Sequence, residues 1–455
     1  MSDEQQTPAR GQVPEAVEPA QVPVSQRDET PTPAMNRVMR EILSAGWIIS
    51  VLAILIALLV GAVLIAVTDP GVQQASAYFF ARPGDTFGAI WNAVIGGYTA
   101  LFEGAIFNPK RGDFLRAIKP LSDTLTFATP LIAAGLGVAL TFRVGLFNIG
   151  GRGQILIAAA CAGWVSWSFE LPAPVHILLA TVAAIVGGAL WAGIAGVLKA
   201  RTGAHEVIVT IMLNYVALYL ISFLLKTPGA LQAPDSNTPK SPAALPSAVY
   251  PSLSDLLGAG AFRVHLGFVF AILATIWVWY LLNRSSLGFR FRAVGENPNA
   301  ARTAGISVKS VYVVAMLMSG GLLGLAGASQ VLGTTTTGFS SGVDAGIGFD
   351  AITVALLGRS RPWGVFLAGL LFGALKSGGY SMQVGEGIPI DIVLVVQSVI
   401  VLLIAAPPLV RSIFRLPAPA GAPGTNGFMN FVAGGASGLL GTVNPNAQLW
   451  TNDAL

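Results

Sequence analysis

Long apolar runs separated by short polar segments occupy the chain from residue 46 to residue 410. The first run, residues 46–67, contains no charged residue. At roughly 1.5 Å per helical residue, it is long enough to cross a hydrocarbon layer about 30 Å thick. Further runs lie at residues 121–142, 150–168, 174–198, 207–225, 264–283, 311–332, 346–358, 363–379 and 389–410. The pattern predicts about ten membrane-spanning helices.

The fold class follows from the backbone of these runs. In lipid, every N–H and C=O group must find a partner inside the protein, so only helices and closed barrels span a membrane. The runs lack the strand-length alternation of a barrel. We therefore expect an all-α integral membrane protein. Residues 87–107 are long enough to span, but Glu103 and several glycines favour an amphipathic helix on the outer surface.

Composition and charge add an orientation. Apolar residues make up 53% of the chain and charged residues only 11%, which is too little charge for a soluble surface. The net charge of +4 would suggest nucleic acid in a soluble protein, but here Lys and Arg gather in short loops between apolar runs. Such loops face the cytoplasm, and the short loops on the other side carry none. We expect both chain ends in the cytoplasm and no nucleic-acid partner.

The two ends of the chain differ in composition from the apolar part. Residues 1–40 are rich in Pro, Gln, Glu and Thr, and residues 417–455 in Gly, Ala, Pro and Asn. Neither composition can bury enough apolar surface to offset the entropy lost on ordering. We expect a disordered cytoplasmic tail over 1–40, a transmembrane domain over 41–416 and a flexible cytoplasmic tail over 417–455.

Signatures of catalysis and metal binding are missing from the sequence. It contains no P-loop (GxxxxGK[ST]), no GxSxG and no HExxH. One cysteine, Cys161, and three scattered histidines offer no metal-binding cluster. We expect a protein that is not an enzyme and binds no metal or cofactor itself.

Polar clusters at the ends of apolar runs are the candidates for function. The first is GLFNIGGRGQ over residues 145–154, in which glycines surround Asn148 and Gln154. So dense a glycine cluster between two spans indicates either a broken helix facing a water-filled path or an ordinary tight turn.

Two further clusters place polar groups within spans. In HEVIVTIMLNY, Thr210 and Asn214 lie four residues apart on one helical face. In GIGFDAITVALLG, Asp350 is an acid in a run too short to cross the membrane easily. Such groups either line a solute path or bond to neighbouring helices, because an isolated polar group in lipid is costly.

The longest inner loop, residues 284–310, carries a different signal. Asn297 and Pro298 are typical of a helix start, and Gly305 of a helix end. A short rigid helix here could receive force from a soluble partner, or the loop could merely anchor the chain at the membrane surface.

Small residues recur every four positions in two spans, at Gly188, Ala192 and Gly196 and at Gly320, Gly324 and Ala328. Such stripes allow helices to approach closely. They fit packing within one subunit, and a dimer face is the alternative.

Taken together, GLFNIGGRGQ, HEVIVTIMLNY, FRAVGENPNAARTAGI and GIGFDAITVALLG resemble the permease subunits of bacterial ABC importers for branched-chain amino acids, ribose and nucleosides. The nucleoside branch, which includes simple-sugar importers, is the most similar, over roughly residues 121–410. The resemblance implies a multi-pass subunit of the bacterial cell membrane that forms a translocation path for nucleosides or related sugar-containing solutes.

The resemblance also implies partners and roles. The partners are an ABC ATPase, which uses ATP and Mg²⁺, a second related permease, an extracytoplasmic solute-binding lipoprotein and the surrounding membrane lipid. The expected path residues are Asn148, Gln154, Thr210, Asn214 and Asp350. The expected ATPase coupling loop contains Gly295, Glu296, Asn297, Pro298, Ala300, Ala301, Gly305 and Ile306.

Two other classes of membrane protein compete with this interpretation. An ion-coupled secondary transporter needs charges within the membrane, for which Asp350 and Lys376 are the notable candidates. An integral-membrane enzyme such as a lipid transferase needs clustered acids or histidines at a membrane surface, and the sequence shows none.

Overall fold

The computed structural model describes residues 46–234, 236–258, 262–406, 409–410 and 413–414, and the expected tails at 1–40 and 417–455 lie outside them. Within the described residues the chain is helical, and its only β pairing is an isolated bridge between Ser252 and His265. The expected all-α fold is confirmed.

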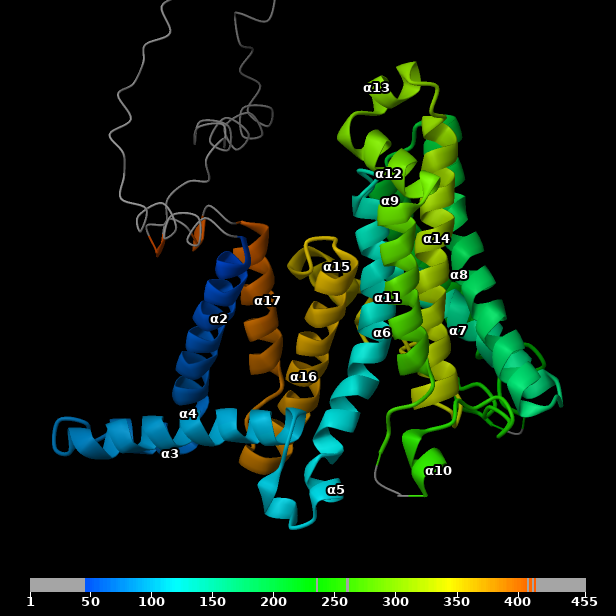
Figure 1. Ribbon diagram of the computed structural model, residues 1–455. Coiled ribbons are helices and arrows are strands. Elements are labelled where there is room, and N and C mark those ends of the chain that lie inside the picture. Colours follow the sequence, from blue (N-terminus) through cyan, green and yellow to red (C-terminus); the bar gives the residue numbers. More distant parts are fainter. Residues whose placement is uncertain (1–45, 235, 259–261, 407–408, 411–412, 415–455) are drawn as a thin grey trace, which may run out of the picture. The chain divides into compact units, whose positions relative to one another are not determined.

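Ten helices coincide with the ten expected apolar runs (Figure 1). They are α2 (Gly46–Thr68), α6 (Lys119–Phe142), α7 (Gly151–Ser168), α8 (Ala173–Thr202), α9 (Glu206–Leu224), α11 (Gly267–Arg284), α14 (Val308–Ser329), α15 (Ile347–Leu357), α16 (Pro362–Glu386) and α17 (Asp391–Ala405). Of the helices in the described part of the chain, 7 are long and apolar enough to cross a membrane. The helices α7, α15 and α17 are shorter or less apolar.

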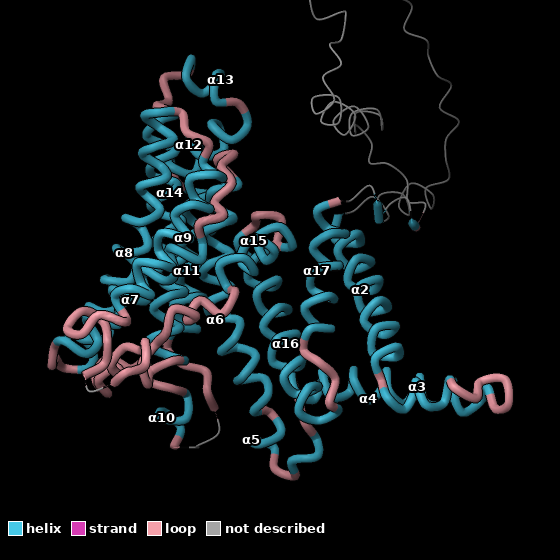
Figure 2. The backbone as a smooth tube through the Cα atoms, turned by 180° about the vertical axis from the view of Figure 1, so that it is seen from behind, coloured by secondary structure: helices cyan, strands magenta, loops and turns pink. Residues whose placement is uncertain are grey.

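One long helix lies crosswise. In both views α4 (Pro83–Ala105) runs across the ends of α2 and α17, next to the short α3 (Pro70–Ser76) (Figures 1 and 2). It is not among the helices apolar enough to span. It is fixed at its end, where the Ser377 hydroxyl donates to the carbonyl oxygen of Gly104 and the Thr124 hydroxyl to that of Ala105. The arrangement agrees with a surface helix at residues 87–107.

The remaining helices are short and lie at the two ends of the bundle. The helices α5 (Phe114–Ala117) and α10 (Leu253–Leu257) lie at the same end as α4, and α12 (Ser286–Glu296) and α13 (Pro298–Thr303) lie at the opposite end (Figure 1). The arginine-rich turns lie at the second end, which the charge distribution predicts to be cytoplasmic. We call it the inner end.

The helix α6 forms the centre of the packing. In its most apolar 18-residue stretch, 83% of the residues are buried. In the corresponding stretches of α2 and α9 only 22% are buried, and their large apolar side chains point outward. The largest core joins α6 to side chains of α11, α14, α15 and α16. Outward apolar side chains on the peripheral helices are expected where lipid is the solvent.

The two small-residue stripes pack against each other. A side chain at Gly188 would collide with the backbone of Gly320 and Gly324, and one at Gly324 with the backbone of Ala184. The helices α8 and α14 therefore approach at backbone distance within one chain. Of the two interpretations of these stripes, packing within one subunit is confirmed.

Candidate functional site

A break in the helical structure separates α6 from α7, and a buried side-chain network holds it. The Asn148 amide donates to Gln154 Oε1 over 3.2 Å and to the Ser319 hydroxyl over 3.0 Å. In return, Asn148 Oδ1 accepts from Gln154 Nε2 at 3.0 Å and from the backbone N–H of Gly150 at 2.9 Å. Asn148 thereby fixes the backbone just before α7 begins.

The helix α9 holds the same break from the other side. Asn214 Oδ1 accepts from the Gly153 N–H at 2.8 Å, and Asn214 Nδ2 donates to the Ile149 carbonyl over 2.9 Å. The Thr210 hydroxyl accepts from the Ile149 N–H at 3.3 Å. We call Asn148, Gln154, Thr210, Asn214 and Ser319 the amide network. The four that the sequence singled out are all at most 5% exposed.

A second break follows α14. The π-helical turn Gln330–Thr334 and an irregular segment lead to the short α15. The start of α15 touches the start of α7, where a Cβ at Gly151 would lie 2.7 Å from the carbonyl oxygen of Gly348. Both helix N-termini carry a partial positive charge, so a nearby negative charge stabilises their contact. The carboxylate of Asp344 lies beside both, because it pairs with Arg152 Nε over 3.3 Å and accepts from the Gly346 N–H at 3.3 Å.

Asp350, in the first turn of α15, belongs to a separate pair. Its Oδ2 lies 3.3 Å from the ammonium group of Lys376 on α16, which also donates to the carbonyl oxygen of Ala345 over 3.2 Å. A carboxylate at membrane depth is costly unless it is paired or hydrated. Asp350 and Lys376, the two charges that the ion-coupled alternative singled out, are therefore paired with each other.

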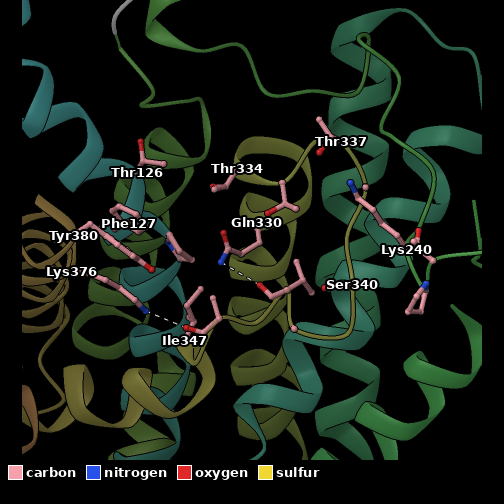
Figure 3. Close-up of a pocket in the computed structure, with 18 residues that line it drawn as sticks. Thr126, Phe127, Lys240, Gln330, Thr334, Thr337, Ser340, Ile347, Lys376 and Tyr380 are labelled. Atoms are coloured by element: carbon pink, nitrogen blue, oxygen red, sulfur yellow. Dashed lines mark hydrogen bonds between the residues drawn. The ribbon is translucent and has the colours of Figure 1, made fainter. Parts of the chain in front are cut away.

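A cavity of about 690 Å³ opens beside this pair. Figure 3 shows Phe127, Tyr380 and Lys376 on one side, Lys240 and Ser340 on the other, and Gln330 between them. Hydroxyl groups dominate its polar lining, which includes Thr126, Thr238, Thr334, Thr335, Thr337, Ser340 and Tyr380. The rings of Phe127 and Tyr380 stack, with centroids 5.6 Å apart and planes at 24°. We call this space the threonine cavity.

The predicted path residues and the threonine cavity are distinct. None of the five lines the cavity, although Asp350 reaches its edge through Lys376. Sequence reasoning missed the cavity residues. One signal was available, because four consecutive threonines, residues 334–337, come just after the apolar run that ends at residue 332.

The expected coupling loop forms the helix pair α12 and α13. Asn297 caps α13 by accepting from the N–H groups of Asn299 at 3.0 Å and Ala300 at 3.1 Å, and Pro298 is its first residue. Gly305 closes the turn with φ of +80°, a conformation that favours glycine. The predicted helix boundaries are confirmed.

The faces of this helix pair differ. Ala301 is 3% exposed and packs, with Ile306, on the core, whereas Glu296 and Ala300 are exposed. A side chain at Gly295 would collide with the carbonyl oxygen of Arg143, where the break before α7 begins. The end of α12 that leads into α13 therefore packs against the backbone at the start of the break that the amide network holds.

Comparison with known proteins adds a family match. The family described as the permease component of the branched-chain amino acid transport system matches residues 121–405. The guanosine ABC transporter permease protein NupP of Bacillus subtilis is 40% identical over 70% of this chain and 88% of its own. The glucose ABC transporter permease protein TsgB13 of Haloferax volcanii is 37% identical over 62% and 75%. A second Bacillus subtilis guanosine permease, NupQ, is 31% identical over 56% and 79%. No solved structure matches the chain.

Proposed function

Because the chain belongs to the family of permease components of branched-chain amino acid transport systems, we propose that it forms the import path for nucleosides or related sugar-containing solutes. Membership makes it a multi-pass membrane subunit of an ABC importer, not an enzyme, working with an ATPase and a second permease. The relatives give no support to an ion-coupled carrier. The proposal concerns the solute, its path, the energy coupling and the remaining partners.

The threonine cavity is the observation that carries the proposal. A nucleoside combines a polar ribose with a flat base. Threonine and serine hydroxyls can both donate to and accept from sugar hydroxyls. The stacked pair Phe127 and Tyr380 offers aromatic surface to a base. A cavity of about 690 Å³ is of the size that small-molecule ligands occupy.

The predicted path residues take a place in this scheme. Asn148, Gln154, Thr210 and Asn214 remain predictions as solute contacts. We assign them to holding the two broken helices on which the inner part of the path depends. Asp350 holds Lys376 at the edge of the threonine cavity, where its ammonium group can meet the solute.

Energy enters through α13 in this proposal. The residues from Gly295 to Ile306 dock on the ATPase, which uses ATP and Mg²⁺ itself. Motion of α13 passes through Gly295 to the backbone at Arg143, then through the contact of Gly151 with Gly348 and the Arg152–Asp344 ion pair to the cavity wall. An extracytoplasmic solute-binding lipoprotein delivers the solute from outside.

Uptake of radiolabelled guanosine by cells that contain the whole importer tests the solute and the path. We expect the double variant F127L/Y380L to lose about tenfold in uptake, since stacking of a base contributes on the order of 1–3 kcal/mol. The matched control is Phe87→Leu, an aromatic residue exposed on α4. Normal uptake by the double variant, or equal competition by unlabelled glucose and guanosine, would contradict the nucleoside assignment.

ATP hydrolysis by the reconstituted importer tests the coupling. Ala300→Trp adds bulk on the exposed face of α13 and should abolish the stimulation of hydrolysis by solute while leaving membrane insertion intact. The control Ala81→Trp places the same side chain at an exposed position of the opposite end. If solute still stimulates ATP hydrolysis in Ala300→Trp as it does in the wild type, α13 is not the coupling helix.

A further inference from the structure

Three arginines from different elements meet at a second cavity, of about 440 Å³, at the inner end of the bundle. Arg143 follows α6, Arg292 lies on α12 and Arg361 directly precedes α16. Two tryptophans, Trp279 of α11 and Trp363 of α16, also line it. We call this space the arginine cavity. Its side chains have no part in the proposed solute path, and of its lining only the backbone of Arg143 lies on the proposed coupling route.

The arginine cavity lacks a negative charge of its own. No carboxylate lines it, and among the described residues none of its three arginines forms an ion pair. Arg143 Nε donates to the carbonyl oxygen of Ser360 over 3.0 Å, and Arg292 Nη1 donates to that of Leu282. Both guanidinium groups keep other N–H donors. Converging like charges without a counter-ion are unfavourable, so the cavity is electrostatically suited to an anion.

Two further observations support an anion. Burial, followed by the positive charges of Arg361 and Arg292, lowers the pKa of Arg143. The cavity also includes the N-terminal residues of α16, from Pro362 to Gly364, where no side chain caps the helix. A helix N-terminus carries a partial positive charge and free N–H groups, which bind phosphate readily.

The tryptophans indicate where the anion comes from. Trp279 is 38% exposed and Trp363 47% exposed. Tryptophan rings gather at the level of the lipid headgroups, where one part of the ring meets acyl chains and the N–H meets polar groups. The cavity lies where spans end at the arginine-rich inner turns, and the cytoplasmic leaflet is the one that carries a negative surface potential.

We propose that the arginine cavity binds the phosphate headgroup of one anionic phospholipid of the cytoplasmic leaflet. The guanidinium groups of Arg292 and Arg361, with the N-terminus of α16, hold the phosphate. Trp279 and Trp363 pack on the glycerol and the first acyl carbons. Arg143, fixed to Ser360, contributes charge from the floor of the cavity.

Native mass spectrometry of the purified importer complex tests this site. The complex is loaded with dioleoylphosphatidylglycerol or with zwitterionic dioleoylphosphatidylcholine. We expect retention of the anionic lipid, and in R292Q/R361Q about 25-fold weaker retention, since each basic residue near a membrane surface contributes roughly a fivefold factor. The control R284Q/R290Q removes two exposed arginines of the same end and should retain the lipid as the wild type does.

Further arms separate the alternatives. R292K/R361K keeps the charge and should restore retention, which distinguishes lost binding from misfolding. Displacement of the lipid by millimolar inorganic phosphate would indicate a free-anion site and overturn the lipid assignment. Two other outcomes would overturn it as well: equal retention of both lipids, and an equal loss of retention in the control variant. Retention by the isolated chain but not by the assembled complex would also overturn it, because it would indicate that an acidic segment of a partner fills the cavity.

Discussion

The amide network and the threonine cavity are both polar regions next to broken helices, yet their polar atoms are satisfied in different ways. In the amide network, side chains bond to each other and to backbone of the break, and almost nothing is exposed. In the threonine cavity, the hydroxyl groups of Thr126 and Thr238 bond within the protein, but most of the others, such as those of Thr334 and Thr337, line an open volume with no partner among the described residues. A buried polar group must be hydrogen-bonded inside the protein, whereas one beside a cavity can bond to water or solute. Variants of the amide network should therefore lose stability, and variants of the threonine cavity should lose transport.

The largest effect is expected from Asn148→Leu in the amide network. It removes the partners of Gln154, Ser319 and the Gly150 N–H, and each buried group left unpaired costs about 1–3 kcal/mol. We expect the free energy of unfolding to fall by about 3 kcal/mol or more. This loss should be visible as low membrane abundance and a lower thermal unfolding temperature in detergent. The control Asn92→Leu, at an exposed position of α4, should behave as wild type. Wild-type stability in Asn148→Leu would mean that the amide network is not structural.

A slightly smaller effect is expected from Gly348→Ala, where α15 touches α7. The added methyl group would collide with the backbone of Arg152, and backbone cannot rotate away as a side chain can. Overpacking of this kind costs about 1–3 kcal/mol. Thermal unfolding measures it, with Gly385→Ala on α16 as the control, because nothing lies within 4 Å of a Cβ there. If both variants unfold alike, the two helix starts are free to separate.

The threonine cavity should respond in transport alone. Replacement of Thr334 and Thr337 by valine removes two hydroxyl groups at almost constant volume. At about 1 kcal/mol for each of the two hydrogen bonds to the solute, the KM for guanosine uptake should rise roughly thirtyfold, with the unfolding temperature unchanged. Thr227→Val, which removes an exposed hydroxyl group, is the control. A fall in stability without a change in KM would mean that these threonines stabilise the fold and do not contact the solute.

The smallest effect is a dependence of the protein's stability on pH, caused by His265 near the threonine cavity. The ring of His265 is buried against Gly333, its Nδ1 accepts from the Gly267 N–H at 3.2 Å, and its Nε2 has no partner within the described residues. Burial lowers its pKa from 6.5 to about 4. The unfolded chain therefore binds a proton that the folded chain does not, and stability falls as pH drops below about 6.5.

Between pH 7.5 and pH 6 this loss amounts to about 1 kcal/mol. Unfolding followed at both values should show it in the wild type and in His205→Gln, which changes an exposed histidine. In His265→Phe the difference should disappear. A slope that survives in His265→Phe belongs to another group.

Residues whose signal is local could be predicted from the sequence. The apolar runs predicted all 7 helices of the described residues that are both long and apolar enough to span, because hydropathy over one helix is enough to decide whether it favours lipid. Asn297, Pro298 and Gly305 predicted α13, because a cap acts within its own turn. The four quoted segments also carried the family resemblance, since they are short and contiguous.

Only the tertiary structure decided what each polar residue does. Asn148 and Thr334 look alike in the sequence, as polar residues at the end of an apolar run. One partner of Asn148 is Ser319, far along the chain, while Thr334 meets a space formed by α6, α16 and two loops. The arginine cavity likewise needs four separate elements. Hydrogen-bond partners and empty volume are non-local properties, so local hydropathy determined the membrane helices and the packing between them determined the sites.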